Sequence, residues 1–199
     1  MAKLYIIRHA ETEIDPAISS TEWKLKPAAH DSLLKMSKEI GLRDVDCIFH
    51  SPLPKAKATA AILGEICGVS LIERQCLKEV ERHFHFIEQE TFRQYVLDYL
   101  SGIRTNHFEE YSKAKQRITQ CISGITKESG PESFAVVSHG MILSVLFHSL
   151  IASDQSPLVW QKMKMPDFSV IDLEKTLVVD GLYSGHKVKF PLATKADSE

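Results

Sequence analysis

A chain of 199 residues can bury one substantial core and is short for two ordinary domains, so we expect a single domain over residues 1–199. The 24 Lys and Arg residues nearly balance the 26 Asp and Glu residues, and this balance excludes both a basic field for nucleic acid and an acidic tail. No apolar run is suited to span a membrane or to act as a signal peptide, so we expect a cytoplasmic protein with neither a membrane nor a nucleic acid as partner.

Runs of strand character alternate with helical repeats along the chain. Short runs rich in β-branched and aromatic residues predict six strands, at 3–7, 46–50, 70–73, 134–138, 169–173 and 176–182. Apolar residues at three- and four-residue spacing predict two amphipathic helices that cover a sheet, at 92–103 and 111–125. The almost wholly apolar segment 141–151 predicts a helix buried in the fold.

This order of elements predicts an α/β fold. We expect three layers, in which a mostly parallel sheet lies between helices on both faces. The last two strands are joined by a tight turn at Glu174 and Lys175, which predicts an antiparallel hairpin at one edge of the sheet.

The four cysteines lie far apart in apolar surroundings, without the C-x-x-C spacing of zinc or dithiol sites. We expect all of them to be reduced and to pack against other residues, namely Cys47, Cys67, Cys76 and Cys121. They indicate neither a metal site nor a cofactor.

Two histidines directly follow predicted strands. His9 comes after Arg8, and His139 comes after Ser138 and before Gly140. The carboxyl ends of parallel strands meet at one edge of a sheet, where ligands bind in open α/β folds. Taken singly, either histidine is better explained as a hydrogen-bonded core residue, so it is the pair that indicates a site.

A third segment, Ser51-Pro52-Leu53-Pro54-Lys55, follows the second predicted strand. We expect Ser51 to cap a helix and the prolines to fit its first turn, which puts Lys55 near the helix N-terminus. A cation there opposes the helix dipole by roughly 0.3–1 kcal/mol unless an anion lies close, which hints at a bound phosphate. By itself, Lys55 is more simply a solvated residue on an exposed turn.

Together these segments resemble the histidine phosphatase superfamily, which includes the phosphoglycerate mutases. The three motifs are Arg8-His9-Ala10-Glu11-Thr12, the S-P-x-x-K-A-x-x-T-A run at 51–60, and Val137-Ser138-His139-Gly140. The resemblance spans nearly the whole chain, because it extends to further short segments at Trp23-Lys24-Leu25, Leu77-Lys78-Glu79, Trp160 and Met165-Pro166-Asp167. It implies a short member of the phosphatase type.

The resemblance implies phosphoryl transfer through His9, whose neutral imidazole would attack phosphorus and form a phosphohistidine. Arg8, Lys55 and His139 would hold the phosphoryl oxygens, and the backbone N–H of Gly140 would point at the same anion. The chemistry of this family needs no metal.

The leaving alkoxide needs a proton, which in this family comes from a carboxylic acid after the third strand. The L-x-E pattern of Leu77-Lys78-Glu79 favours Glu79. The run Glu81-Arg82-His83-Phe84 also resembles the E-R-H-Y run of the mutases and would nominate Glu81. Both alternatives stay open, with Glu79 preferred because its distance from the strand fits the shorter phosphatases.

Two positions depart from the family pattern. Lys55 stands where an arginine is usual, and it keeps the charge but loses the two-pronged geometry. Asp15 stands where many members have an asparagine that contacts phosphate, so we expect its carboxylate to point away from the site.

The spacing of His83 and His85 could suit a metal only if further ligands converged on them. We instead expect these histidines and Arg82 to form a polar rim that selects the substrate.

We interpret the chain as a phosphomonoesterase whose partner is a small phosphorylated metabolite. One alternative is a cofactor-dependent phosphoglycerate mutase, although the chain has little room for the insertions that enclose a retained phosphoryl group. Another is a catalytically weak phosphate-binding member, which Lys55 and Asp15 would explain. The sequence leaves the natural substrate and the oligomeric state open.

Overall fold

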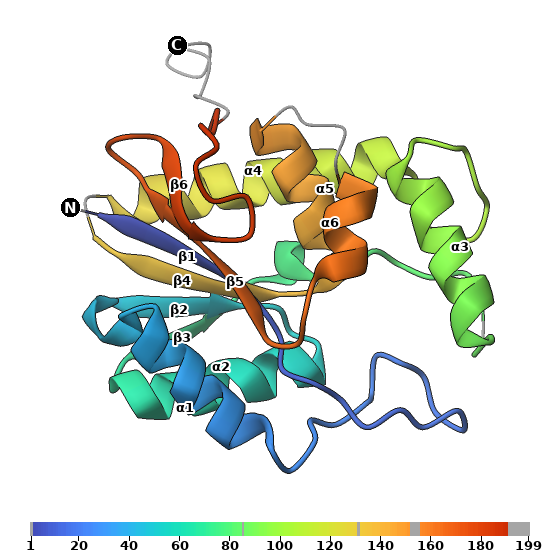
Figure 1. The fold of residues 1–199 in the computed structure, drawn as a ribbon, viewed down its shortest axis with the longest axis horizontal. Helices are drawn as coiled ribbons and strands as arrows, with labels where there is room; N and C mark the ends of the chain where they lie inside the picture. The colour runs from blue at the N-terminus through green and yellow to red at the C-terminus, as the bar shows by residue number, and fades with distance from the viewer. Residues whose placement is uncertain (1, 85, 131, 152–155, 191–199) are drawn as a thin grey trace.

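A six-stranded sheet runs through the molecule, as the computed structural model of the chain shows (Figure 1). The structure describes residues 2–84, 86–130, 132–151 and 156–190. The strands lie in the order β3-β2-β4-β1-β5-β6. Their bounds are β1 Lys3–Arg8, β2 Cys47–His50, β3 Ser70–Glu73, β4 Phe134–Ser138, β5 Asp167–Asp172 and β6 Leu177–Gly181.

Four of the strands form the parallel part of this sheet. β3, β2, β4 and β1 pair in parallel, while β5 is antiparallel to β1 and β6 is antiparallel to β5. The predicted α/β fold, with a mostly parallel sheet and an antiparallel edge hairpin, is confirmed. β1 ends one residue later than predicted, at Arg8, so His9 is the first residue beyond the sheet.

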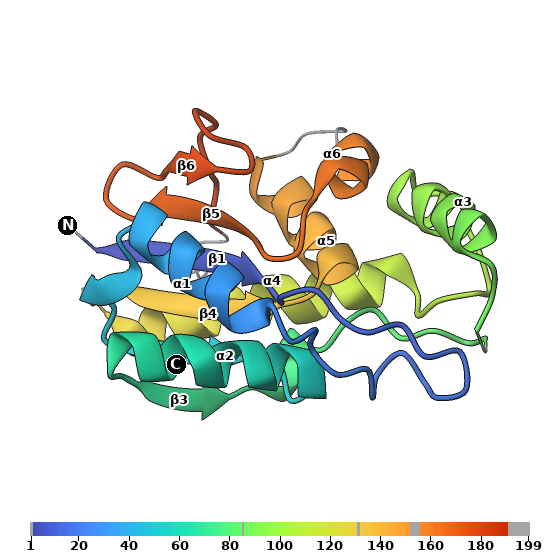
Figure 2. The same cartoon turned by 60° about the horizontal axis from the view of Figure 1, so that its bottom comes forward.

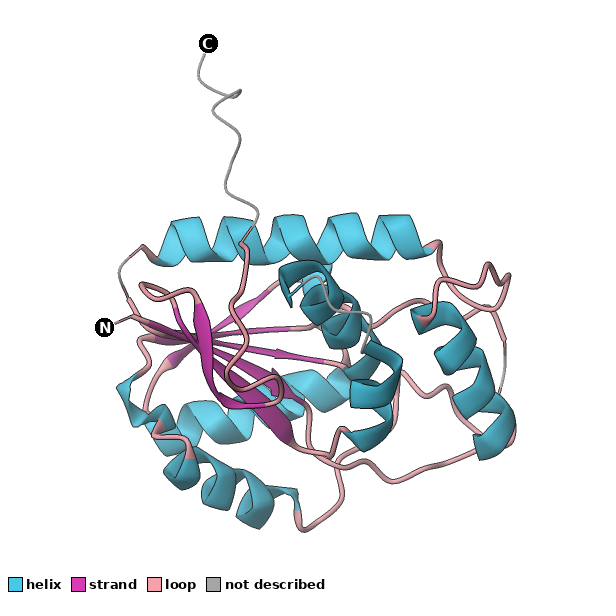
Figure 3. Cartoon of the chain, turned by 45° about the horizontal axis from the view of Figure 1, so that its top comes forward, coloured by secondary structure: helices cyan, strands magenta, loops and turns pink. Residues whose placement is uncertain are grey.

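Helices cover both faces of the sheet (Figures 1 and 2). α1 and α2 lie on one face, and α4 and α5 lie on the other, where α4 runs across the whole layer (Figure 3). The helices are α1 Ala29–Glu39, α2 Pro54–Cys67, α3 Gln89–Leu100, α4 Tyr111–Ser129, α5 Gly140–Ile151 and α6 Ser156–Lys162, with short 3-10 turns at Leu42–Asp44 (η1) and Gln75–Leu77 (η2). No helix among the described residues is both long and apolar enough to cross a membrane.

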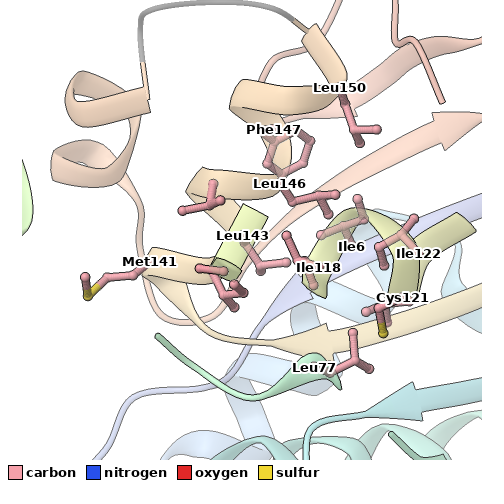
Figure 4. Close-up of a cluster of buried hydrophobic side chains, with 14 of the residues drawn as sticks. Ile6, Leu77, Ile118, Cys121, Ile122, Met141, Leu143, Leu146, Phe147 and Leu150 are labelled. Atoms are coloured by element: carbon pink, nitrogen blue, oxygen red, sulfur yellow. The ribbon is translucent and has the colours of Figure 1, made fainter. Parts of the chain in front are cut away.

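The strands bury alternate residues on the two faces. Leu4 and Ile6 pack with α4 and α5, whereas Tyr5 and Ile7 pack with α1 and α2. Figure 4 shows Ile6 beside the apolar side chains of the first of these clusters. Full burial of one such side chain stabilises the fold by about 1.5–3 kcal/mol, so both faces hold the strands in register.

α3 does not cover the sheet, and that part of the prediction is wrong. The helix lies beyond the ends of the strands, where it packs against α5 and α6 (Figure 1). Its buried residues Val96, Tyr99 and Leu100 join the cluster that also holds Phe108. An apolar stripe reports that a helix face is covered but does not say by what, and here other helices cover it.

The cysteine prediction is wrong for one pair. Cys76, in η2, and Cys121, in α4, form a disulfide with their Cα atoms 5.8 Å apart. The two residues are 45 positions apart in the chain, so only the packing of η2 against α4 brings them together. Cys47 and Cys67 are free thiols.

Candidate active site

His9 and His139 lie side by side because their strands are neighbours in the sheet. β1 pairs with β4 so that Arg8 stands opposite Ser138, and the His9 N–H donates to the Ser138 carbonyl at 3.0 Å. The two imidazole rings, whose centroids are 5.2 Å apart, are buried, with exposed fractions of 5% and 0%.

The tautomer of His9 is determined by its backbone contact. His9 Nδ1 lies 2.7 Å from the Ala10 carbonyl, which can only accept, so Nδ1 carries the proton and Nε2 carries the lone pair. The Ala10 N–H donates in turn to Thr59 Oγ1 at 3.0 Å, which ties this turn to α2. Burial, and then the Lys55 ammonium, lower the pKa of His9 well below its usual range, so the ring is neutral at pH 7.

His139 is held by Ser51. His139 Nε2 lies 2.7 Å from Ser51 Oγ, and the same oxygen accepts the Leu53 N–H at 3.2 Å. The prediction that Ser51 caps α2 is therefore wrong, because the N-cap position of this helix is Leu53. Because this oxygen already accepts from Leu53, we infer that the Ser51 hydroxyl donates its own proton to Nε2, which puts the proton of His139 on Nδ1. Burial, and then His9, hold the pKa of His139 well below its usual range.

Lys55 is buried, so the interpretation as a solvated residue is wrong. Its exposed fraction is 6%, and its Nζ donates to the Ser20 carbonyl at 3.0 Å and lies 5.8 Å from the centre of the Trp23 ring. The loop before α1 thus folds over the first turn of α2. Burial, and then the Arg82 guanidinium, lower the pKa of Lys55 to about 8.

Arg8 spans the space between the histidines and the segment before β5. Its Nη1 donates to the carbonyls of Met163 and Lys164, at 2.9 and 3.2 Å. A Cβ on Gly140 would lie only 3.0 Å from Arg8 Cζ and 3.1 Å from Arg8 Nε. The glycine that opens α5 is therefore needed for the close approach of this guanidinium.

Two polar atoms at this edge of the sheet are buried without a partner. Among the described residues, no hydrogen-bond partner reaches Arg8 Nε or His139 Nδ1. A buried donor without a partner costs about 1–3 kcal/mol, so an anion that accepted from both atoms would recover that free energy.

Glu79 lies at the N-terminus of α5, next to Gly140. Its Oε1 accepts the N–H groups of Val80 and Ile142 at 2.9 and 2.8 Å, and its Oε2 accepts the Met141 N–H at 3.2 Å. Burial lowers the pKa values of Arg8 and Lys55, and the negative charge of Glu79 partly opposes this shift, so the carboxylate acts electrostatically on both cations.

The chain has a clear relationship to one family. Residues 4–176 match the histidine phosphatase superfamily (branch 1). The chain belongs to this superfamily.

Individual histidine phosphatases and related proteins resemble the chain over most of its length. It is 22% identical to "Phosphoserine phosphatase 1" of Hydrogenobacter thermophilus, over 88% of each chain. It is 24% identical to "Probable phosphoglycerate mutase GpmB" of Erwinia tasmaniensis, over 76% of this chain and 75% of that one. A phosphoserine phosphatase from Entamoeba histolytica, solved with 3-phosphoglyceric acid, superposes with a TM-score of 0.70 at 18% identity, over 95% of each chain.

Within this histidine phosphatase, the two glutamates that the sequence left open have different surroundings. Glu79 is held at the N-terminus of α5, whereas Glu81 is exposed and its backbone N–H donates to Glu109. Asp15, the other carboxylate in question, is also exposed and accepts the Ala17 N–H at 2.9 Å, as expected for a residue that points away.

Arg82 belongs to the site more closely than a rim residue would. Its guanidinium lies 4.3 Å above the Phe92 ring and donates to Ser20 Oγ at 3.1 Å, and its charge lowers the pKa values of His9 and Lys55. The signal for it was the E-R-H-F run. His83 is exposed, His85 lies outside the described residues, and the described part of the chain holds no cluster of metal-ligating side chains.

Proposed function

We propose that this protein is a phosphomonoesterase that hydrolyses a small phosphorylated metabolite through a phosphohistidine on His9. The names of its relatives support a phosphatase, because both phosphoserine phosphatases match it over most of its length. We take phosphoserine as the first compound to test, since Arg82 offers a third cation, beside Arg8 and Lys55, for a substrate carboxylate.

The observation that carries this proposal is the state of His9. The ring is neutral, and its Nδ1–H donates to the Ala10 carbonyl. The lone pair on Nε2 is therefore the nucleophile. A neutral nitrogen suits attack on a phosphoryl dianion because it brings no further negative charge. The Nε2–P bond would form as the bond from phosphorus to the leaving oxygen breaks, and water would then release inorganic phosphate.

The charge of the transferring phosphoryl group would meet a preorganised set of donors. At this edge of the sheet, Arg8 Nε and His139 Nδ1 are buried without a hydrogen-bond partner among the described residues, and Lys55 adds a cation from α2. The N–H of Gly140, the first residue of α5, adds a donor at the positive end of the helix dipole, while the next two N–H groups donate to Glu79.

We assign proton donation to Glu79. Its Oε2 accepts a single N–H, that of Met141, so the other lone pair of this oxygen can hold the proton that goes to the leaving alkoxide. Glu81 has no comparable place in the site, which supports Glu79 as the acid.

We also propose that residues 1–199 act as one domain, in the cytoplasm and without a metal. The cationic side chains and the α5 N-terminus supply the positive charge that a metal ion would otherwise provide. Full activity after dialysis against a chelator would support this, and restoration by a divalent ion would contradict it.

Trapping of the intermediate tests the proposed function directly. We expect that rapid acid-free quenching of a reaction with ³²P-labelled phosphoester labels one peptide, that the label is acid-labile, and that the peptide contains His9. His9→Ala should abolish both label and turnover while the circular dichroism spectrum stays unchanged. A label on the peptide of His50, the buried histidine at the end of β2, would overturn the assignment.

A further inference from the structure

The segment 76–79, which ends in Glu79, is attached to α4 at its first residue, Cys76. Cys76 closes η2 against Cys121 of α4 through the disulfide, and Glu79 follows three residues later. Leu77, between them, is fully buried, and its carbonyl accepts Ser138 Oγ at 2.8 Å. Figure 4 shows Leu77 and Cys121 on the two elements that the disulfide joins.

Arg117 attaches the same segment a second time. Its Nη1 donates to the carbonyls of Cys76 and Lys78 at 2.9 and 2.8 Å, and its Nη2 pairs with Glu109. Arg117 and Cys121 are four residues apart in α4, so they lie on one face of that helix. The three carbonyls that precede Glu79, those of Cys76, Leu77 and Lys78, are therefore all held in place.

We propose that Cys76 and Cys121 form a reversible oxidation site that controls the proton donor of the reaction, with Arg117 as its positioning residue. The proposal rests on the proposed function, because it acts through Glu79. In the oxidised protein, the disulfide holds the Glu79 carboxylate where it can protonate the leaving group. Reduction leaves Arg117 as the remaining tie to α4 and lets the carboxylate move.

A reductant can reach the bond. A surface pocket of about 600 Å³ lies over it, lined by Cys76, Lys113, Gln116, Arg117, Gln120 and Cys121. Cys76 is half-buried, whereas Cys121 is 7% exposed, so attack would fall on the sulfur of Cys76.

The exchange balances with a dithiol as reductant. One thiolate of the dithiol attacks Cys76 Sγ, the Cys76–Cys121 bond breaks, and Cys121 leaves as a thiolate that takes up a proton. The second thiol of the reagent then closes a ring and releases Cys76 as a thiol. Two electrons pass to the protein, and the reagent ends as a cyclic disulfide. A disulfide oxidant reverses the exchange.

The experiment uses the full-length chain, oxidised with glutathione disulfide or reduced with dithiothreitol, with the state of each cysteine read by alkylation and mass spectrometry. We expect reduction to lower kcat for an alkyl phosphate by about tenfold, since general acid catalysis contributes 10²–10⁴. Nitrophenyl phosphate, whose leaving group needs no proton, should change less than about twofold. Reoxidation should restore the first rate.

Variants separate a positioning role from a merely structural one. Cys121→Ser should behave as the reduced protein and ignore the redox state, whereas the double variant Cys47→Ser/Cys67→Ser, which removes the free thiols, should respond as the parent does. Arg117→Ala should lose activity on the alkyl phosphate selectively, and Arg117→Lys should restore part of it.

The possible outcomes are distinct. Equal losses for both substrates on reduction would mean general loosening of the fold and would overturn the inference. A protein that cannot be oxidised at Cys76 and Cys121, or whose alkyl phosphate rate ignores the redox state, would overturn it as well while the proposed function stands. An oxidised protein without activity on either substrate would overturn the proposed function itself.

Discussion

Lys55 departs from the arginine of the family pattern, and its burial gives this site an unusual cation. Its ammonium is buried beside Arg8 and Arg82, and no carboxylate forms an ion pair with it among the described residues. Burial and these two cations lower its pKa to about 8, so the lysine that should hold the phosphoryl group changes its charge in a range that an arginine would not.

A pH profile should reveal this lysine. Lys55 is charged below its pKa of about 8 and neutral above it, so kcat/KM should fall as the pH rises through that value. Lys55→Arg should keep its charge and move the alkaline limb upward by more than about one pH unit, with equal or higher activity at pH 7. Superimposable alkaline limbs would show that Lys55 does not set this limb.

The assignment of Glu79 as the proton donor gives a second prediction for a single residue. Glu79→Gln should slow an alkyl phosphate by about 10²–10⁴ and nitrophenyl phosphate far less, since only the alkoxide needs a proton. Glu81→Gln is the matched control, and because Glu81 is exposed we expect rates within about twofold of the parent. The reverse pattern would move the role to Glu81.

Single residues also show which parts of the candidate site could be predicted from the sequence. His9 and His139 follow buried strands, and strand ends can be recognised from apolar runs, so their meeting was predictable. The hydrogen bond between Ser51 and His139 was not predictable, because a serine just before a helix is typical of an N-cap. The burial of Lys55 depends on the loop of Ser20 and Trp23, whose path no local pattern predicts.

Among the elements, α5 carries most of the site at one end. Its first residue, Gly140, admits the Arg8 guanidinium, and its next two N–H groups bind Glu79. The sequence predicted this helix from its apolar composition, and it predicted β3 and β4 at their observed bounds. The sequence analysis did not predict the short turn η2, and it placed α3 on the sheet, whereas α3 packs against α5 and α6. The apolar face of a helix does not identify the element that covers it.

Two glycine-to-alanine changes test the role of the first turn of α5. Gly140→Ala puts a Cβ 3.0–3.2 Å from the guanidinium of Arg8, so we expect KM for phosphoesters to rise about tenfold as Arg8 is displaced, one lost charge contact being worth about 1.4 kcal/mol. Gly124→Ala in α4 is the control, because its Cβ would meet nothing within 4 Å. It should leave activity unchanged and stabilise the protein by about 0.5–1 kcal/mol. Equal KM values for both variants would contradict the close approach.

For the molecule as a whole, the sequence predicted the α/β class, the mostly parallel sheet and the edge hairpin, but it predicted neither the order of the strands nor the cross-links between distant segments. Alternating apolar residues and strand lengths predict a layered α/β fold by themselves. The Cys76–Cys121 disulfide joins residues 45 positions apart, and its formation requires η2 to be packed on α4. Contacts of this kind are properties of the assembled fold.

The segments that cover the site distinguish a phosphatase from a mutase. Short segments close over the site: the loop of Ser20 and Trp23 reaches Lys55, and the segment of Met163 and Lys164 reaches Arg8. We expect such covers to admit water, so a panel of phosphoesters should release inorganic phosphate and yield no bisphosphoglycerate. Vanadate should inhibit as a five-coordinate analogue. Rapid interconversion of 2- and 3-phosphoglycerate with negligible phosphate release would favour the mutase.

The register between β1 and β4 has a consequence for how such a protein can change. Because Arg8 stands opposite Ser138, the spacing of His9 and His139 is set by main-chain bonds of the central sheet, while the segments that close over them come from distant loops. The two histidines are thus positioned by the sheet, whereas the loops contact the cations Arg8 and Lys55. Under the proposed function, we expect that substitutions in the loops can change the surroundings of a substrate while the main-chain pairing of β1 and β4 keeps His9 and His139 at the same spacing, so that new specificities can evolve on an unchanged sheet.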